Sequence, residues 1–152
     1  MVAPAVDGID LLTRATDLLN MFTAEKNVLG MWDSVDGGYF FGLRFSCTSP
    51  AHPGRAIVDR KRKEAGRQAI MLQAFHLANA LTVHRYANME SRMLEVALRH
   101  IYQPAIHGVP SIVNANWSFQ RFRNGTLNEM VTTEAMGTEL ESLFAVGRCV
   151  SG

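Results

Sequence analysis

Two long loops in the sequence combine aromatic residues with polar side chains of the kind that bind sugars. The first loop contains Trp32 and Tyr39 and leads to Arg67 and Gln68, and the second loop contains Trp117. Aromatic faces beside guanidinium and amide groups are typical of a carbohydrate site, so these five residues are candidate substrate-binding residues. The same rings could instead pack the loops onto the helices, because aromatic side chains are mostly buried.

Three titratable residues are candidates for proton transfer by their type and placement: Glu64, His76 and Glu134. His76 lies in an apolar run, where a core histidine with satisfied hydrogen bonds is the alternative interpretation. The five histidines have no HxxxH or HExxH spacing, so we expect no metal site. The sequence has no P-loop and no GxGxxG motif, and we expect no cofactor.

Basic residues gather between residues 55 and 67, where six Lys or Arg side chains stand against Asp59 and Glu64. A solvated surface is the first interpretation of this cluster. Because positive charge at the start of a helix is unfavourable unless an anion binds, the alternative is an anionic ligand such as a uronate or a phosphorylated sugar. The whole chain carries a net charge of only +1 and has no docking motif, so we expect no nucleic-acid partner.

Hydrophobic periodicity predicts four helices to position these residues, at about residues 7–25, 59–82, 88–102 and 132–146. The first and second helices, and the third and fourth, are separated by loops of nearly thirty residues that are expected to contain short strands. A short turn joins the two halves. This order predicts two helix–loop–helix units, at about 7–82 and 88–148, with both long loops at one edge.

Length and composition are those of one globular domain, since the chain has 152 residues of which 47% are hydrophobic and 19% charged. Cys47 and Cys149 show no metal-site or disulfide spacing, as expected in a reducing compartment. The first ten residues do not read as a signal peptide, and no segment is long and apolar enough to cross a membrane. We therefore expect a cytoplasmic protein with no membrane partner.

Two motifs point to a known family. The segment WDSVDGGYF at residues 32–40, followed by DRKRKEAGRQ at residues 59–68 and an apolar helix, resembles the amino-terminal portion of N-acylglucosamine 2-epimerase-like proteins and related (α/α)6 toroids. The resemblance implies a mainly α fold, made of two helical hairpins of the toroid type with short β-hairpins in the long loops. It also implies that Arg67 contacts sugar hydroxyls with Gln68 beside it. The family's catalytic histidine pair lies in later hairpins, which this chain is expected to lack.

Two functions follow as hypotheses from this sequence. The first is carbohydrate binding or processing, as a sugar epimerase or isomerase if a homo-oligomer completes the ring. Four helices per chain would give twelve in a homotrimer. The alternative is a non-catalytic helical interaction protein, or a truncated toroid with no independent activity, whose aromatic loops are structural and whose eight Met residues serve an interface.

Overall fold

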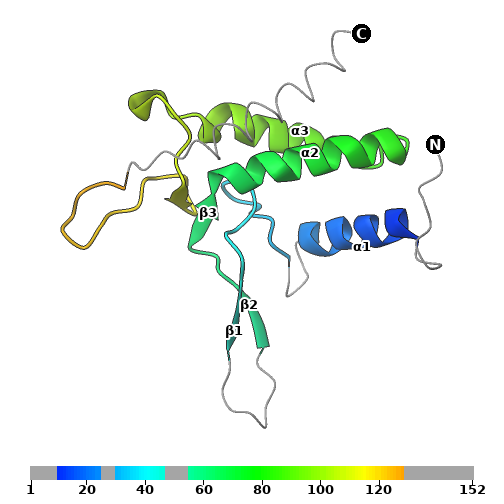
Figure 1. The fold of residues 1–152 in the computed structure, drawn as a ribbon, viewed down its shortest axis with the longest axis horizontal. Helices are drawn as coiled ribbons and strands as arrows, with labels where there is room; N and C mark the ends of the chain where they lie inside the picture. Colours follow the sequence, from blue (N-terminus) through cyan, green and yellow to red (C-terminus); the bar gives the residue numbers. More distant parts are fainter. Residues whose placement is uncertain (1–9, 25–29, 47–54, 129–152) are drawn as a thin grey trace.

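The computed structural model describes residues 10–24, 30–46 and 55–128 of the chain, and this part is mainly helical. Helices α1 (Leu11–Thr23), α2 (Ala65–Leu81) and α3 (Ala87–Val96) run beside one another in Figure 1, and α3 continues into a π-helical turn, η1 (Ala97–Ile101). Helices α1 and α2 lie within the ranges expected for the first two helices, and α3 begins one residue before the expected start of the third. The expected fourth helix lies outside the described residues.

Helix α1 begins at Leu11 because Asp10 caps it. The Asp10 carboxylate accepts hydrogen bonds from the backbone N–H groups of Leu12 and Thr13, at 3.0 and 3.1 Å. A further hydrogen bond from the Thr13 hydroxyl is the largest cause of a lowered Asp10 pKa. At the other end of the helix, the Thr23 hydroxyl lies 2.9 Å from the Tyr39 hydroxyl, so α1 is joined to the loop that follows it.

Four short strands lie in the long loops, in two antiparallel pairs. Strands β1 (Leu43–Ser46) and β2 (Arg55–Val58) form the projecting hairpin in Figure 1. Strand β3 (Arg62–Glu64) pairs with β4 (Ile112–Asn114), so the end of the first loop is joined to the second loop. A local hairpin was expected in each loop, and this pairing between the loops was not foreseen.

The start of α2 differs from the sequence prediction. The helix was expected from about residue 59, but residues 62–64 pair with β4 and the helix begins only at Ala65. The reason is that the backbone groups of these residues bond to the second loop instead of to the next helical turn. Most of the basic cluster therefore lies ahead of the helix, in a turn and a strand.

The core forms where α2 packs on α3 and on the first loop. Leu72, Phe75 and Met93 are fully buried there, and the Phe75 ring lies 6.3 Å from Tyr39 and 5.7 Å from Tyr86 between ring centroids. Burying such side chains supplies most of the stabilisation of a helical layer. This core makes α2 the central element, with α1 and α3 beside it.

Another face of α2 carries exposed apolar side chains. Ile70, Leu77 and Leu81 are 53%, 62% and 52% exposed, and their spacing places them along one stripe of the helix. Within the described ranges, no helix is long and apolar enough to cross a membrane. The stripe is thus a local apolar surface on a helix that is buried on its other sides.

Candidate functional site

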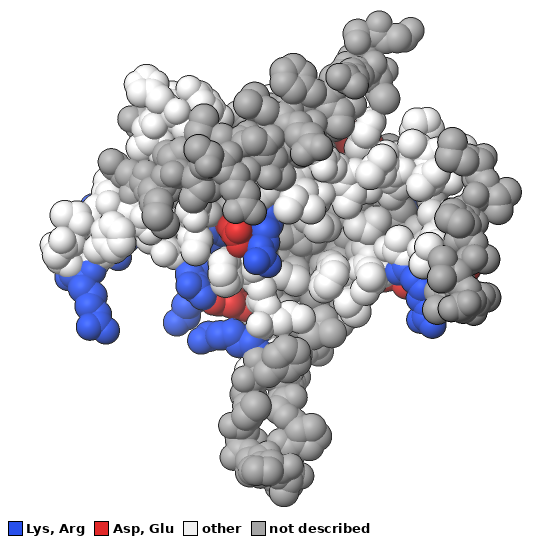
Figure 2. All heavy atoms as spheres, in the orientation of Figure 1, with Lys and Arg blue, Asp and Glu red and all other residues white. Residues whose placement is uncertain are grey.

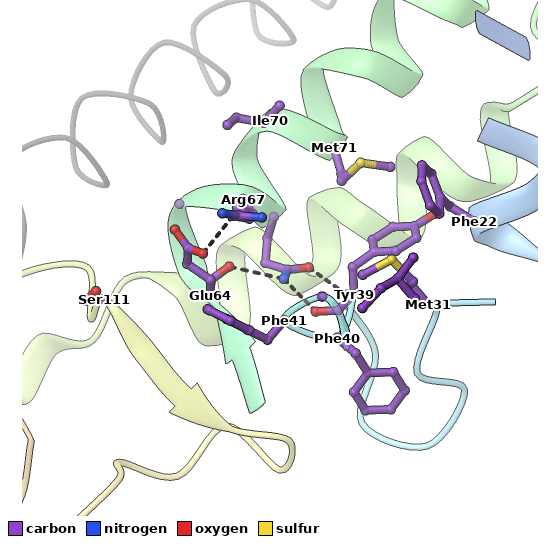
Figure 3. Close-up of a pocket in the computed structure, with 14 residues that line it drawn as sticks. Phe22, Met31, Tyr39, Phe40, Phe41, Glu64, Arg67, Ile70, Met71 and Ser111 are labelled. Carbon is purple, nitrogen blue, oxygen red and sulfur yellow. Dashed lines mark hydrogen bonds and ion pairs between the residues drawn. The ribbon is translucent and has the colours of Figure 1, made fainter. Parts of the chain in front are cut away.

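A hollow of about 710 Å³ opens beside the amino-terminal end of α2. Its walls come from α1, from the loop that leads into β1, and from the first two turns of α2, as Figure 3 shows. The lining residues are Phe22, Met31, Tyr39, Phe40, Phe41, Gly42, Leu43, Glu64, Gly66, Arg67, Gln68, Ile70, Met71 and Ser111. Four of the eight predicted site residues are among them, and these four are described first.

Arg67 and Glu64 form an ion pair at the rim of this hollow. The Arg67 Nε atom lies 2.7 Å from the Glu64 carboxylate, and the two side chains are 62% and 30% exposed. The Arg67 guanidinium also lies 5.7 Å from the centroid of the Phe41 ring. Glu64 occupies the N-cap position of α2 without making a capping hydrogen bond. Its carboxylate is therefore used to orient Arg67 at the mouth of the hollow.

Gln68 follows Arg67 directly but is buried, and its amide holds the backbone of Tyr39. The Tyr39 N–H donates to Gln68 Oε1 at 2.7 Å, and Gln68 Nε2 donates to the Tyr39 carbonyl at 2.8 Å. This pair of bonds imitates a strand partner, and both amide atoms are engaged within the protein. Gln68 lines the hollow and at the same time fixes the loop that forms its wall.

Tyr39 is the aromatic wall that Gln68 positions. Its hydroxyl meets Thr23, and its ring packs edge-on against Trp32 at 5.3 Å between centroids. Burial raises the pKa of Tyr39 to about 12, the hydrogen bond with Thr23 opposing the shift. The phenol therefore remains protonated at neutral pH.

Neither Trp32, in the first loop, nor Trp117, in the second, lines the hollow. The Trp117 indole N–H donates to the carbonyl of Asp36 at 2.9 Å, and its ring stacks on His100 at 5.0 Å. The Trp117 backbone is left-handed, with φ of 64°, which is uncommon for a residue with a side chain. Both tryptophans border a separate hollow of about 360 Å³ near α3.

His76 lies farther along α2 and faces α3. Its Nδ1 atom is 2.7 Å from a carboxylate oxygen of Glu90, and the Asn79 amide donates to the other oxygen of the same carboxylate. Asn79 Oδ1 in turn accepts the backbone N–H of Tyr86, at 2.6 Å. The structure does not bring His76 to the hollow beside Arg67. Glu134 lies outside the described residues.

Sequence reasoning missed a buried ion pair between Lys63 and Asp33. The Lys63 ammonium is 2.8 Å from the carboxylate, and the lysine side chain is fully buried. It lies 4.7 Å from the Trp117 ring and 5.7 Å from the Phe40 ring. Burial lowers the pKa of Lys63, and the hydrogen bond with Asp33 opposes the shift. In a strand, successive side chains point to opposite faces, so Lys63 in the middle of β3 points away from its basic neighbour Arg62. A strand assignment at residues 62–64 was the one signal that could have separated Lys63 from the basic cluster.

No metal-binding group of three His, Cys, Asp or Glu side chains occurs among the residues that the structure describes. The side chains at the hollow are instead a guanidinium, a carboxylate and an amide framed by aromatic rings and two thioethers. Such a set can hydrogen-bond hydroxyl groups and cover the apolar face of a ring.

Comparison with known proteins supports the toroid resemblance at the level of fold. No protein-family model and no curated protein matched the sequence. Two similar solved structures are the cellobiose 2-epimerase from Bacillus thermoamylovorans B4167, with a TM-score of 0.65 and 14% identity, and a D-mannose isomerase, with a TM-score of 0.58 and 17% identity. They cover 93% and 91% of this chain.

The alignment spans 34% and 33% of those two proteins, so this chain has about a third of their length. Both are (α/α)6 toroid enzymes, and the partial coverage fits an amino-terminal portion of such a ring. The expected resemblance to this class of toroid is confirmed. Sequence identity is low, and the likeness is therefore one of fold.

Proposed function

We propose that this chain provides part of a sugar-processing pocket, in a protein that epimerises or isomerises a small carbohydrate. The observation that carries the proposal is the hollow beside Arg67, in a fold shared with two proteins named for sugar epimerisation and isomerisation. Aromatic walls beside a guanidinium and a carboxylate suit a polyol ligand.

The proposed roles follow from the contacts within the hollow. Arg67 donates hydrogen bonds to sugar hydroxyls, Tyr39 forms a wall, and Gln68 keeps Tyr39 in place. Glu64 orients Arg67 and is the carboxylate best placed for proton transfer among the lining residues. His76 and Glu134 stay proposed as further proton-transfer groups, and Trp32 and Trp117 as substrate contacts. His76, Trp32 and Trp117 do not line the hollow, so these roles would require a larger site than the hollow alone.

Homo-oligomerisation belongs to the same proposal. The stripe of Ile70, Leu77 and Leu81 needs an apolar neighbour, and in a ring of helical hairpins the adjacent hairpins would supply it. Since the chain has about a third of the length of the two similar enzymes, three copies would match one ring. Light scattering coupled to size-exclusion chromatography measures the native mass, and a mass of three chains is the expected result.

A second candidate function is a non-catalytic interaction protein. The observation that favours it is that Trp32, Trp117 and Gln68 make their contacts within the protein, while α2 carries an exposed apolar stripe. Such a protein would bind a partner through α2 and would have no sugar ligand. The two functions therefore differ in whether a sugar stabilises the folded chain.

A thermal-shift series with glucose, mannose and cellobiose tests the sugar proposal, since a ligand that binds only the native state raises its apparent stability. We expect the melting temperature to rise with at least one sugar. In Arg67→Ala the affinity for that sugar, obtained from the shift at increasing sugar concentration, should fall at least about tenfold, because a charged hydrogen bond is lost. Arg85→Ala, which removes an exposed arginine that does not line the hollow, is the matched control. No shift with any sugar would favour the interaction protein.

A further inference from the structure

Positive charge dominates the rim of the hollow beside Arg67. Residues 39–46 and 59–68, which build this side of the molecule, contain six basic residues and two acidic ones. One of the six, Lys63, is buried and paired with Asp33, so five basic residues remain at the surface. Figure 2 shows the Lys and Arg side chains gathered around β3 and the adjoining part of β1 and β2, with Asp and Glu atoms between them. The local excess of basic residues seen in the sequence is thus gathered on one surface of the folded chain.

The two acids lie deeper than the arginines that they neutralise. Asp59 is 4% exposed while its partner Arg62 is 38% exposed, and Glu64 is 30% exposed while Arg67 is 62% exposed. Hydrogen bonding to Arg62 is the largest cause of a lowered Asp59 pKa, so this carboxylate stays ionised. Because the cations are the outer members of both pairs, a ligand that approaches the rim meets them first.

Phe41 lies close to both of these cations. The Arg62 guanidinium is 4.5 Å from the centroid of the Phe41 ring, and that of Arg67 is 5.7 Å from it. Phe41 lines the hollow, as Figure 3 shows, so both guanidinium groups lie near one of its walls. Contact with an aromatic ring limits the freedom of an arginine and keeps its donors in one place.

Three more basic residues on this side make no direct ion pair among the described residues: Arg44, Arg60 and Lys61, all exposed. Arg44 is still near enough to Asp59 to help lower the pKa of that carboxyl. Within the first turn of α2, which also borders the hollow, no residue is acidic, and Glu64 at the N-cap makes no capping hydrogen bond, so the amino-terminal N–H groups add to the positive potential. A neutral sugar would leave this potential without a counterpart.

We infer that the ligand of this hollow is an acidic sugar, whose carboxylate or phosphate lies at the rim beside Arg62 and Arg67. The inference rests on the proposed sugar-binding function and adds the class of the sugar. A guanidinium pair recognises both kinds of anion, since each offers several oxygen acceptors to a planar donor group. The ring of the sugar then occupies the inner part of the hollow, against Tyr39 and Phe41.

Isothermal titration of the full chain with glucose, glucuronate and glucose 6-phosphate, and with the corresponding mannose series, tests this inference. We expect at least one acidic sugar to bind roughly tenfold more tightly than its neutral parent, and the difference to shrink as NaCl is raised, because salt screens exposed charges. The uronate and phosphate arms distinguish the two sources of the anion.

Arg62→Gln sharpens the result, because it removes a rim charge and leaves Arg67 in place. We expect the ratio of the affinity for the acidic sugar to that for its neutral parent to fall toward one in this variant. Arg14→Gln, on α1, is the matched control and should keep the preference. Circular dichroism of each variant checks that the chain is folded.

The possible outcomes separate this inference from the proposed function. Equal binding of neutral and acidic sugars would overturn the inference and leave the sugar-binding function standing. An acid preference that survives in Arg62→Gln would overturn the assignment of the rim. If no sugar of either kind binds to the folded chain, the proposed function itself is wrong and the inference falls with it.

Discussion

The two ends of α2 use polar residues in different ways. At the amino-terminal end, Arg67 and Glu64 form a partly exposed ion pair above a hollow. At the carboxyl-terminal end, His76 and Asn79 bond to Glu90 of α3, and the His76 and Glu90 side chains are only 16% and 20% exposed. The first end has charged groups available to a ligand, whereas the second uses its polar groups to join two helices.

The difference teaches that residue type alone does not locate a site on this helix. A histidine beside a carboxylate is a common catalytic pair, yet here that pair lies within a helix–helix contact. The less distinctive arginine next to a buried glutamine is the one beside the hollow. Substitutions at each end of α2, and in the loop that packs on it, test this contrast.

Gly38→Ala should have the largest effect. Gly38 has φ of 84°, and an added Cβ would lie 2.7 Å from the Trp117 ring and 3.0 Å from Gln68 Oε1. We expect a loss of about 4 kcal/mol in the free energy of unfolding, from a steric clash added to backbone strain. Gly125→Ala is the control, because φ there is 85° but nothing lies within 4 Å of its Cβ.

Urea denaturation of the two glycine variants measures both values. The control should lose only about 1 kcal/mol, which is the cost of backbone strain alone. Equal losses in the two variants would contradict the close packing of Gly38 against Trp117 and Gln68.

Gln68→Leu should cost about 3 kcal/mol. Leucine keeps most of the side-chain volume but leaves the Tyr39 N–H and C=O without their partner in a buried place. Gln73→Leu, at a half-buried position of the same helix, should be close to neutral. The measurement is again urea denaturation, and a neutral Gln68→Leu would show that the loop does not depend on this amide.

Tyr39→Phe should change how stability responds to alkaline pH. Because the folded-state pKa is raised from 10 to about 12, the unfolded chain loses the phenol proton first, and stability is lost as pH rises from about 10 to 12. The loss is about 2 kcal/mol and is absent in the variant, which has no phenol. The difference in unfolding free energy between wild type and variant, followed from pH 8 to 12, measures it. A difference that stays constant would contradict the burial of the phenol.

Glu90→Gln should have the smallest effect on stability, about 1 kcal/mol, because the pair with His76 weakens while hydrogen bonding to Asn79 is partly kept. Sugar binding should be unchanged, since Glu90 does not line the hollow. Glu95→Gln, in the exposed pair with Arg99, is the control and should cost less than about 0.5 kcal/mol. If sugar binding were lost in Glu90→Gln but not in the control, the functional site would lie at the carboxyl-terminal end of α2 and not at the hollow beside Arg67.

Much of the fold could be predicted because α2 and the motifs around it carry strong local signals. The apolar run after Gln68 predicts a central helix, and the residues from Trp32 to Phe40 together with those from Asp59 to Gln68 predict the likeness to (α/α)6 toroids that the structural comparison confirms. The pairing of β3 with β4 could not be predicted, because it joins segments some fifty residues apart through backbone groups that carry no sequence pattern.

The candidate site was predicted only in part. The residues at the start of α2 were found because a charged cluster before an apolar helix stands out in a sequence. Lys63 was hidden among other basic residues, and only the direction of its side chain in β3 separates it from them. The contacts of the Phe41 ring with two guanidinium groups could likewise not be predicted, since they depend on how the loop folds.

The sequence by itself determined that this protein has a central apolar helix with basic and aromatic residues at its start, because side-chain hydrophobicity and spacing are local properties. Which of those residues are exposed at the hollow depends on the tertiary structure. Arg67 and Gln68 are neighbours in the chain, but successive residues of a helix point about 100° apart. The loop folded against α2 therefore buries Gln68 and leaves Arg67 at the hollow.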